Sequence, residues 1–196
     1  MTTTTPTPTD QLSRALGATA GLVAGVRDDQ WTGPTGCPDW TVRELVNHLV
    51  GGNLAFAAVL TDQIPPDRAA DRLGDDPIAA YHHAGEMLVA AFAQPGVLDR
   101  VVTVPAGTVP GIAALHLRIT ELLVHGWDLA RATGQATTVL PADLAEAEHA
   151  FSVGKLDDLP PGRRPFAPPQ PAAADLPAID RLAALLGRPL PAGERS

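Results

Sequence analysis

A carboxylate and an imidazole stand four residues apart in an apolar stretch, Glu121-Leu-Leu-Val-His125. On an α-helix, residues i and i+4 lie on one face, one turn apart. Glu121 and His125 are therefore expected to point toward the same place. A helix that buries both groups needs a reason, because buried polar groups without partners cost free energy. The pair has the chemistry of half a metal site.

His48 is the candidate that completes this half-site. It lies in a second segment with apolar residues at helical spacing, and Gly51 and Gly52 follow it closely. Each glycine costs a helix about 1 kcal/mol relative to alanine, so the pair predicts that another helix or a small ligand approaches the backbone there. His48, Glu121 and His125 would leave an open position, as in catalytic zinc sites. Iron(II) or nickel suit the same donors.

The spacing alone also fits buried histidines that only form hydrogen bonds. Three nearby residues have similar alternatives. Arg131 could bind a substrate carboxylate, and Asp128 could orient a ligand histidine; an ion pair or a helix-end role is equally open for each. Cys37 is interpreted as a small buried side chain in a tight loop rather than a redox or metal thiol.

The remaining histidines are not expected at the site. His116 precedes His125 by nine residues, which puts it on the opposite side of the helix. His82 and His83 are adjacent, so they point about 100° apart, and we expect them to be partly exposed. The tryptophans are interpreted as core residues.

Four long helices must position these residues. The apolar periodicity and the capping signals predict them over 10–26, 41–62, 76–93 and 110–134, with a β-hairpin over 97–110. A short helix over 141–153, a proline-rich loop over 159–177 and a last helix over 176–186 follow. The pattern predicts an all-α four-helix bundle over 10–135. We expect a disordered lead over 1–9 and a C-terminal extension over 136–196 that packs on the bundle.

Composition excludes several classes of protein. The 196 residues carry a net charge of −8, which disfavours a nucleic-acid partner. No apolar run reaches the roughly 18–20 residues that span a bilayer, and the N-terminus lacks the pattern of a signal peptide. A single cysteine, Cys37, excludes an internal disulfide and favours the cytoplasm. The protein is expected to be a monomer or a homodimer.

Two motifs resemble a known family. The run Cys-Pro-Asp-Trp-Thr-Val-Arg-Glu-Leu-Val-Asn-His-Leu, residues 37–49, resembles the opening motif of the mycothiol-dependent maleylpyruvate isomerase N-terminal domain. The run His-Gly-Trp-Asp-Leu-Ala-Arg-Ala-Thr-Gly-Gln, residues 125–135, resembles the second motif of a metal-binding actinobacterial branch of that superfamily, and the tail over 165–189 is similar to the same branch. The wider group is the DinB-like four-helix bundle.

The resemblance implies a zinc site and a thiol cofactor. The family's zinc is held by a histidine of the second helix and a Glu-x-x-x-His pair of the fourth, and these positions match His48, Glu121 and His125. In the mycothiol-dependent enzymes the cofactor's thiol binds the open metal position, where the metal lowers its pKa. The implied function is a metal-dependent transferase or isomerase that uses mycothiol on a small electrophilic substrate.

One departure limits the resemblance. The isomerase has a separate C-terminal domain, whereas this chain has only the tail over 141–196. The resemblance therefore carries the site and leaves the reaction open. A non-catalytic bundle that binds a metal or a small molecule is the alternative. A third, weaker hypothesis is a bundle that shapes a substrate in a biosynthetic pathway, with an incidental metal.

Overall fold

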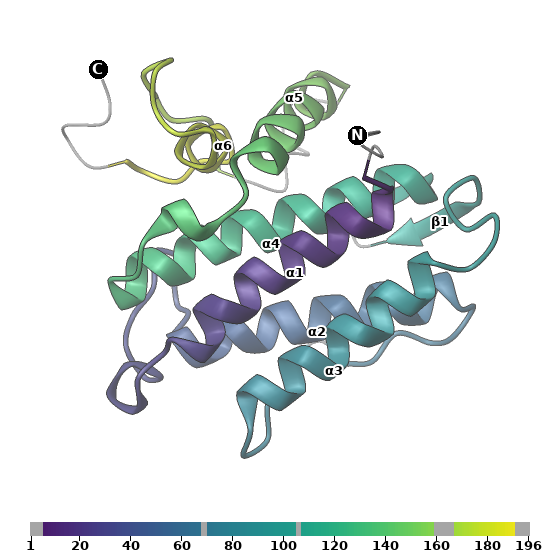
Figure 1. Ribbon diagram of the computed structural model, residues 1–196, viewed down its shortest axis with the longest axis horizontal. Helices are drawn as coiled ribbons and strands as arrows, with labels where there is room; N and C mark the ends of the chain where they lie inside the picture. The colour runs from purple at the N-terminus through teal and green to yellow at the C-terminus, as the bar shows by residue number, and fades with distance from the viewer. Residues whose placement is uncertain (1–5, 68–69, 105–106, 159–166, 191–196) are drawn as a thin grey trace, which may run out of the picture.

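Four helices form the bundle in the computed structural model (Figure 1). The structure describes residues 6–67, 70–104, 107–158 and 167–190. These helices are α1 (Pro8–Ala24), α2 (Val42–Leu60), α3 (Pro77–Phe92) and α4 (Gly111–Thr133). α1 packs against α3 and α4, and α2 packs against the same two helices. The predicted all-α four-helix bundle is confirmed.

Side-chain caps fix where the helices begin and end. A capping box begins α2, since the side chains of Thr41 and Glu44 each accept a hydrogen bond from the other residue's backbone N–H. α4 ends at Gly134, whose φ of 70° lies in the left-handed region that favours glycine. Asp76 caps α3 as predicted. The local sequence signals therefore placed these three boundaries within a residue or two.

The start of α1 differs from the prediction. Thr7 and Asp10 form a second capping box, so the helix begins at Pro8, two residues earlier than expected. The disordered lead predicted over 1–9 therefore overlaps the helix by two residues, and residues 1–5 lie outside the described part of the chain. The helix starts earlier because Asp10 acts as the capping-box partner in the first turn and is not itself the cap.

A two-stranded hairpin leads into α4, as predicted. β1 (Val101–Val104) pairs antiparallel with β2 (Gly107–Pro110), with Val102 opposite Val109. The predicted turn residues 105 and 106 lie outside the described residues. Val102 and Val104 are buried, so the hairpin covers one end of the bundle core.

The C-terminal helices lie against α4. α5 (Ala142–Asp158) and α6 (Ala178–Leu185) pack on each other and on α4, on the side away from α2 and α3 (Figure 1). α5 extends five residues beyond its predicted end at Val153, and α6 starts two residues later than predicted. Two short 3-10 helices, η1 (Asp28–Gln30) and η2 (Thr137–Val139), complete the described elements.

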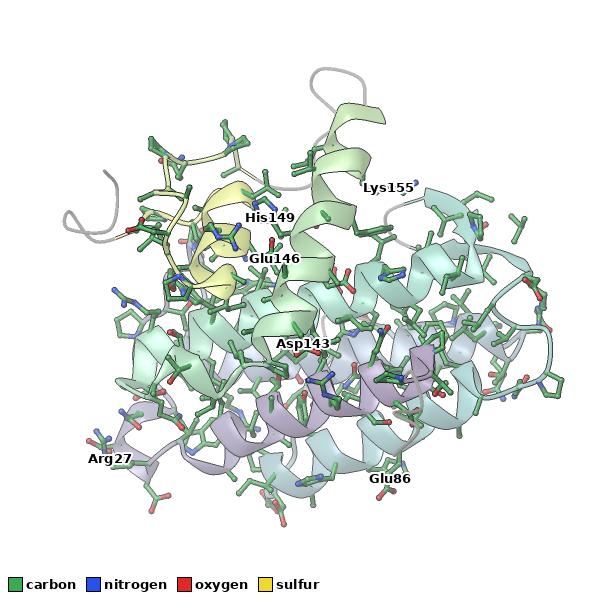
Figure 2. The ribbon with its side chains drawn as sticks, turned by 45° about the horizontal axis from the view of Figure 1, so that its top comes forward. Arg27, Glu86, Asp143, Glu146, His149 and Lys155 are labelled. Carbon is green, nitrogen blue, oxygen red and sulfur yellow. The ribbon has the colours of Figure 1, made fainter. Side chains whose placement is uncertain are left out.

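Ion pairs attach α5 to its neighbours. Arg14 of α1 lies 2.7 Å from Asp143, and Arg181 of α6 pairs with Glu146. Figure 2 shows Asp143 near the start of α5, and Glu146 and His149 beside α6. Arg14, Asp143 and Glu146 are exposed and Arg181 is half-buried, and ion pairs this close to solvent contribute little individually. Within the described residues, no helix is both long and apolar enough to cross a bilayer.

Candidate metal site

Two predicted ligand histidines meet where α2 packs on α4. The ring centroids of His48 and His125 lie 4.9 Å apart, with the rings nearly edge-on at 73°. Trp40, in the loop before α2, lies 4.6 Å from the His48 ring and 5.9 Å from the His125 ring. Trp40 is half-buried and also packs against the core, so the predicted core role is only part of its environment. Its position immediately before the cap of the helix that carries His48 is the sequence signal for this contact.

Glu121 lies one turn before His125 on α4, and an arginine holds its carboxylate. Nη1 of Arg118 donates to Oε2 of Glu121 at 2.5 Å. Partial burial raises the pKa of Glu121, but the positive charges of Arg118, His125 and His48 outweigh it, so the pKa is lowered. Oε1 forms no hydrogen bond with the described residues. One carboxylate oxygen is thus fixed, and the other is available beside the two imidazoles.

Arg118 is fully buried, and sequence reasoning missed it. Its Nε donates to Oδ1 of Asn53 at 2.8 Å, and Nη2 donates to the backbone carbonyl of Leu49 at 2.8 Å. The guanidinium lies against Gly52, where a Cβ would stand 2.9 Å from Cζ. The predicted close approach at the glycines is therefore the approach of an arginine side chain. Gly51, by contrast, faces open space.

Asp128 contacts the second ring nitrogen of His125. Oδ2 of Asp128 lies 3.0 Å from Nδ1 of His125, which is the contact that the orienting role requires. Burial raises the pKa of Asp128, while hydrogen bonds from His125 and Arg188 lower it, with a net decrease. An ionised carboxylate only accepts hydrogen bonds, so Nδ1 carries a proton, and in the neutral ring Nε2 therefore keeps its lone pair. This is the usual tautomer of a metal-ligating histidine with a carboxylate partner.

Arg188 reaches this carboxylate from the C-terminal extension. Its Nη2 donates to Oδ2 of Asp128 at 2.9 Å. Arg131, suggested by the sequence as a binder of a substrate carboxylate, is exposed and has its guanidinium 5.5 Å from the ring centroid of Trp127. The sequence does not indicate that Arg188 contacts Asp128, because 60 residues separate the two and no helical periodicity relates them.

Cys37 belongs to an alternative set of donors. Within the described ranges, the group of three His, Cys, Asp or Glu donors that lie within 4.8 Å of one another is Cys37, His125 and Asp128. Sγ of Cys37 donates to Oδ2 of Asp128 at 3.3 Å. Burial and the charge of Asp128 raise the pKa of the thiol to about 12. A metal ion bound here would deprotonate the thiol and would compete with Arg188 for Asp128, so Cys37, His125 and Asp128 form a second candidate donor set.

The excluded histidines lie elsewhere, as expected. His116 faces α5, where its Nδ1 is 2.8 Å from Oε1 of Glu148, and its ring stacks on Phe151. His82 and His83 are both exposed. A groove of about 460 Å³ lies along α2 and α3 between residues such as Leu54 and Met87, and it shares no residue with the site.

By donor type, the predicted set of His48, Glu121 and His125 suits a divalent cation, whereas the three donor atoms that lie within 4.8 Å of one another in the described residues belong to Cys37, His125 and Asp128. The predicted set offers two imidazoles and one carboxylate oxygen, a combination that suits zinc, iron and nickel. His125 is held by Asp128 in the tautomer that leaves Nε2 available, and Oε1 of Glu121 is not engaged by a described residue. The ring separation of 4.9 Å brings the two histidines to one place. The sequence-predicted residue for which the structure records no contact with this cluster is Arg131, whereas Cys37, interpreted from the sequence as a small buried side chain, contacts Asp128.

Comparisons with known proteins match the chain to a family and to two relatives. Residues 12–130 match the model of the mycothiol maleylpyruvate isomerase N-terminal domain family. Two uncharacterized proteins from strains of Mycobacterium tuberculosis, Rv0738 and MT0763, are each 38% identical over 175 residues, which cover 89% of this chain and 94% of theirs.

Solved structures show the same fold. Crystal structures of the mycothiol-dependent maleylpyruvate isomerase and of a mutant of it superpose with TM-scores of 0.57 and 0.59, at 17% and 15% identity. Each alignment covers 74% of this chain and 69% of the other. The predicted DinB-like bundle is thereby confirmed. The matched family segment ends before α5 and α6, which therefore lie outside it.

Proposed function

Because the chain belongs to the mycothiol maleylpyruvate isomerase N-terminal domain family, we propose that it is a metal-dependent enzyme that uses a low-molecular-weight thiol. The thiol is mycothiol in this proposal, and the substrate is a small electrophile. The observation that carries the proposal is the meeting of His48 and His125 beside Glu121, with Nδ1 of His125 already held by Asp128. A cytoplasmic monomer or homodimer is part of the same proposal.

His48, Glu121 and His125 are the proposed ligands, and zinc is the proposed metal, with iron and nickel as alternatives. A bound divalent cation would lower the pKa of a thiol or water and so supply a nucleophile at neutral pH. Asp128 fixes the tautomer and the ring orientation of His125. Trp40 covers one side of both imidazole rings and limits access of bulk water there.

Arg131 remains a proposed substrate-binding residue. It is exposed and follows Asp128 by nearly one turn of α4, so its guanidinium could receive a carboxylate of an anionic substrate. The guanidinium lies over the face of the Trp127 ring, which leaves its N–H donors unused by that contact.

A specific observation favours a second candidate function. Both carboxylates of the site already have arginine partners, Arg118 for Glu121 and Arg188 for Asp128. A site neutralised in this way can bind a small molecule without a metal. The alternative is therefore a non-catalytic bundle that binds a metal or a small molecule, and it predicts saturable binding without turnover.

Metal analysis of variants tests the proposal. Untagged wild-type protein is reconstituted with zinc, iron(II) or nickel and compared with His48→Ala, Glu121→Gln and His125→Ala. We expect near-stoichiometric metal in wild type and its loss in all three variants. The matched control is His82→Ala, which removes an exposed histidine of α3 and should keep its metal. If the wild-type protein binds none of the three metals, the proposed metal-dependent enzyme is ruled out, and the non-catalytic bundle that binds a small molecule is favoured.

A further inference from the structure

We infer that Arg118 is a positioning residue that holds Glu121 in a one-oxygen binding mode and so sets the affinity of the site for a divalent cation. This inference rests on the proposed function, because it concerns the same site. Arg118 would not touch the metal; it would act through Glu121.

The guanidinium is fixed on three sides. Nε is bonded to Asn53, Nη2 to the carbonyl of Leu49 and Nη1 to Glu121, at 2.8, 2.8 and 2.5 Å. The Phe56 ring lies below it, 5.8 Å from Cζ. A planar fork held by two acceptors on α2 cannot follow the Glu121 carboxylate if that group rotates. The carboxylate must instead adopt the orientation that the arginine dictates.

That orientation leaves a single oxygen for the cation. Oε2 is engaged by Arg118, and Oε1 takes part in no hydrogen bond with the described residues. The side chain of Glu121 keeps 29% of its surface exposed, whereas Arg118 is fully buried. A second, equally short contact between a cation and Oε2 would place two positive charges on one oxygen. Binding through Oε1 alone avoids this repulsion.

The packing of Gly52 supports a role beyond simple charge pairing. Arg118 occupies the space that a side chain at this position would fill, as a Cβ would lie 2.9 Å from Cζ. An alanine here must displace the guanidinium. Gly52→Ala leaves both Arg118 and Glu121 in the protein. Any change in metal binding is then due to the displacement of the guanidinium and not to the loss of its charge. Gly51 faces open space on the same helix, which makes Gly51→Ala a matched control with the same gain in helix propensity.

The experiment compares zinc affinity and the cobalt(II) absorption spectrum of full-length wild type, Gly52→Ala, Gly51→Ala and Arg118→Lys. Loss of a group that orients a metal ligand typically weakens metal binding by about 10- to 100-fold. We expect a loss in this range for Gly52→Ala and Arg118→Lys, with a changed cobalt(II) spectrum because the carboxylate can now bind through both oxygens. Gly51→Ala should match wild type in both readouts.

The outcomes separate the inference from the proposed function. If wild type binds no divalent metal, the proposed function fails, and the inference fails with it. If wild type binds metal, and folded Gly52→Ala has the affinity and spectrum of Gly51→Ala, only the inference is overturned, and Arg118 is purely structural. Should Gly52→Ala not fold, Asn53→Ala carries the same comparison, because it removes the acceptor of Nε and leaves Gly52 intact.

Discussion

At the scale of single residues, Asp128 links two parts of the chain to one imidazole. Its carboxylate accepts from Nδ1 of His125 and from Arg188 of the C-terminal extension. Arg188 has only donors, so it requires an oxygen of residue 128. Arg188 therefore holds the Asp128 carboxylate in a fixed orientation, and the carboxylate in turn sets the tautomer of His125.

Asp128→Ala is expected to release that tautomer. Nδ1 of His125 and Nη2 of Arg188 both contact Oδ2 of Asp128, and alanine offers neither of them an acceptor. The proton of the neutral imidazole is then no longer held on Nδ1 and can move to Nε2, where it blocks metal binding. Long-range ¹H–¹⁵N spectra of the imidazole measure the tautomer directly, and zinc titration should show about a 10- to 100-fold weaker affinity. A wild-type-like Nδ1–H tautomer in the variant would contradict this mechanism, and Asp99→Ala, at an exposed position, is the control.

The sequence predicted residues of the site that share a helix and missed those that reach it from elsewhere. Glu121, His125 and Asp128 follow from helical spacing alone, and His48 from a separate amphipathic segment with adjacent glycines. Arg188 could not be found, because no periodicity relates the extension to α4. Arg118 had an indirect signal in Gly52, but a sequence does not show which side chain fills the space over a glycine.

At the scale of elements, a buried carboxylate attaches α5 to α4. Oε1 of Glu148 lies 2.8 Å from Nδ1 of His116, and Oε2 accepts from the hydroxyl of Thr120 at 3.0 Å. Glu148 is 1% exposed. The hydrogen bond to Glu148 raises the pKa of His116, against an opposing effect of burial.

This pair predicts a pH-dependent stability. A histidine whose pKa is raised on folding contributes stability that is fully present below its unfolded pKa of about 6.5 and is lost as pH rises through its folded pKa. The free energy of unfolding of wild type relative to His116→Gln should therefore fall as the pH rises above about 6.5. Urea denaturation across this range measures the difference.

Other groups near α5 titrate as well, and the comparison removes them. Burial and the charge of Arg181 lower the pKa of His149, which gives a pH dependence of the opposite sign. His149 is present in both proteins, so its contribution cancels. His82→Gln, which removes an exposed imidazole, is the matched control. A constant difference between wild type and His116→Gln would mean that the pair gains nothing from protonation.

The elements themselves were largely predictable, and their ends followed from caps. The four bundle helices and the hairpin appear where periodicity and turn residues indicated them. The ends of α5 and α6 were less accurate, by five and two residues. α5 is weakly amphipathic because its buried face carries polar residues such as Glu148 together with apolar ones. Helix ends are predicted from apolar residues that recur on one face, and this pattern is blurred in α5.

At the scale of the whole molecule, a buried hydrogen bond joins the extension to the bundle. Nε1 of Trp127, on α4, donates to Oδ1 of Asp180, on α6, at 2.6 Å. Both side chains are buried, and Ile179 and Leu182 of α6 belong to the same apolar core as α4. The extension therefore shares the core of the bundle, and we expect the two to unfold together.

Asp180→Ala tests this expectation. Loss of a buried hydrogen-bond partner costs about 1–3 kcal/mol, and each kcal/mol shifts the melting temperature of a protein this size by about 2–4 °C. Circular dichroism and tryptophan fluorescence should report one coincident transition, lowered in the variant. Asp175→Ala, at an exposed position of the extension, should leave it unchanged. Two separate transitions, with only one affected, would indicate independently folding parts.

The buried arginine also determines the lengthwise register of two helices. Apolar side chains at helical spacing would tolerate a slide of one turn, about 5.4 Å, because similar surfaces would meet again. Arg118 does not tolerate it, since its acceptors on α2 are Asn53 and the carbonyl of Leu49. A slid helix would leave a charge unpaired in the core, which is strongly destabilising. The hydrogen bonds of Arg118 therefore allow one lengthwise register of α2 against α4. In that register the His48 ring lies beside the His125 ring.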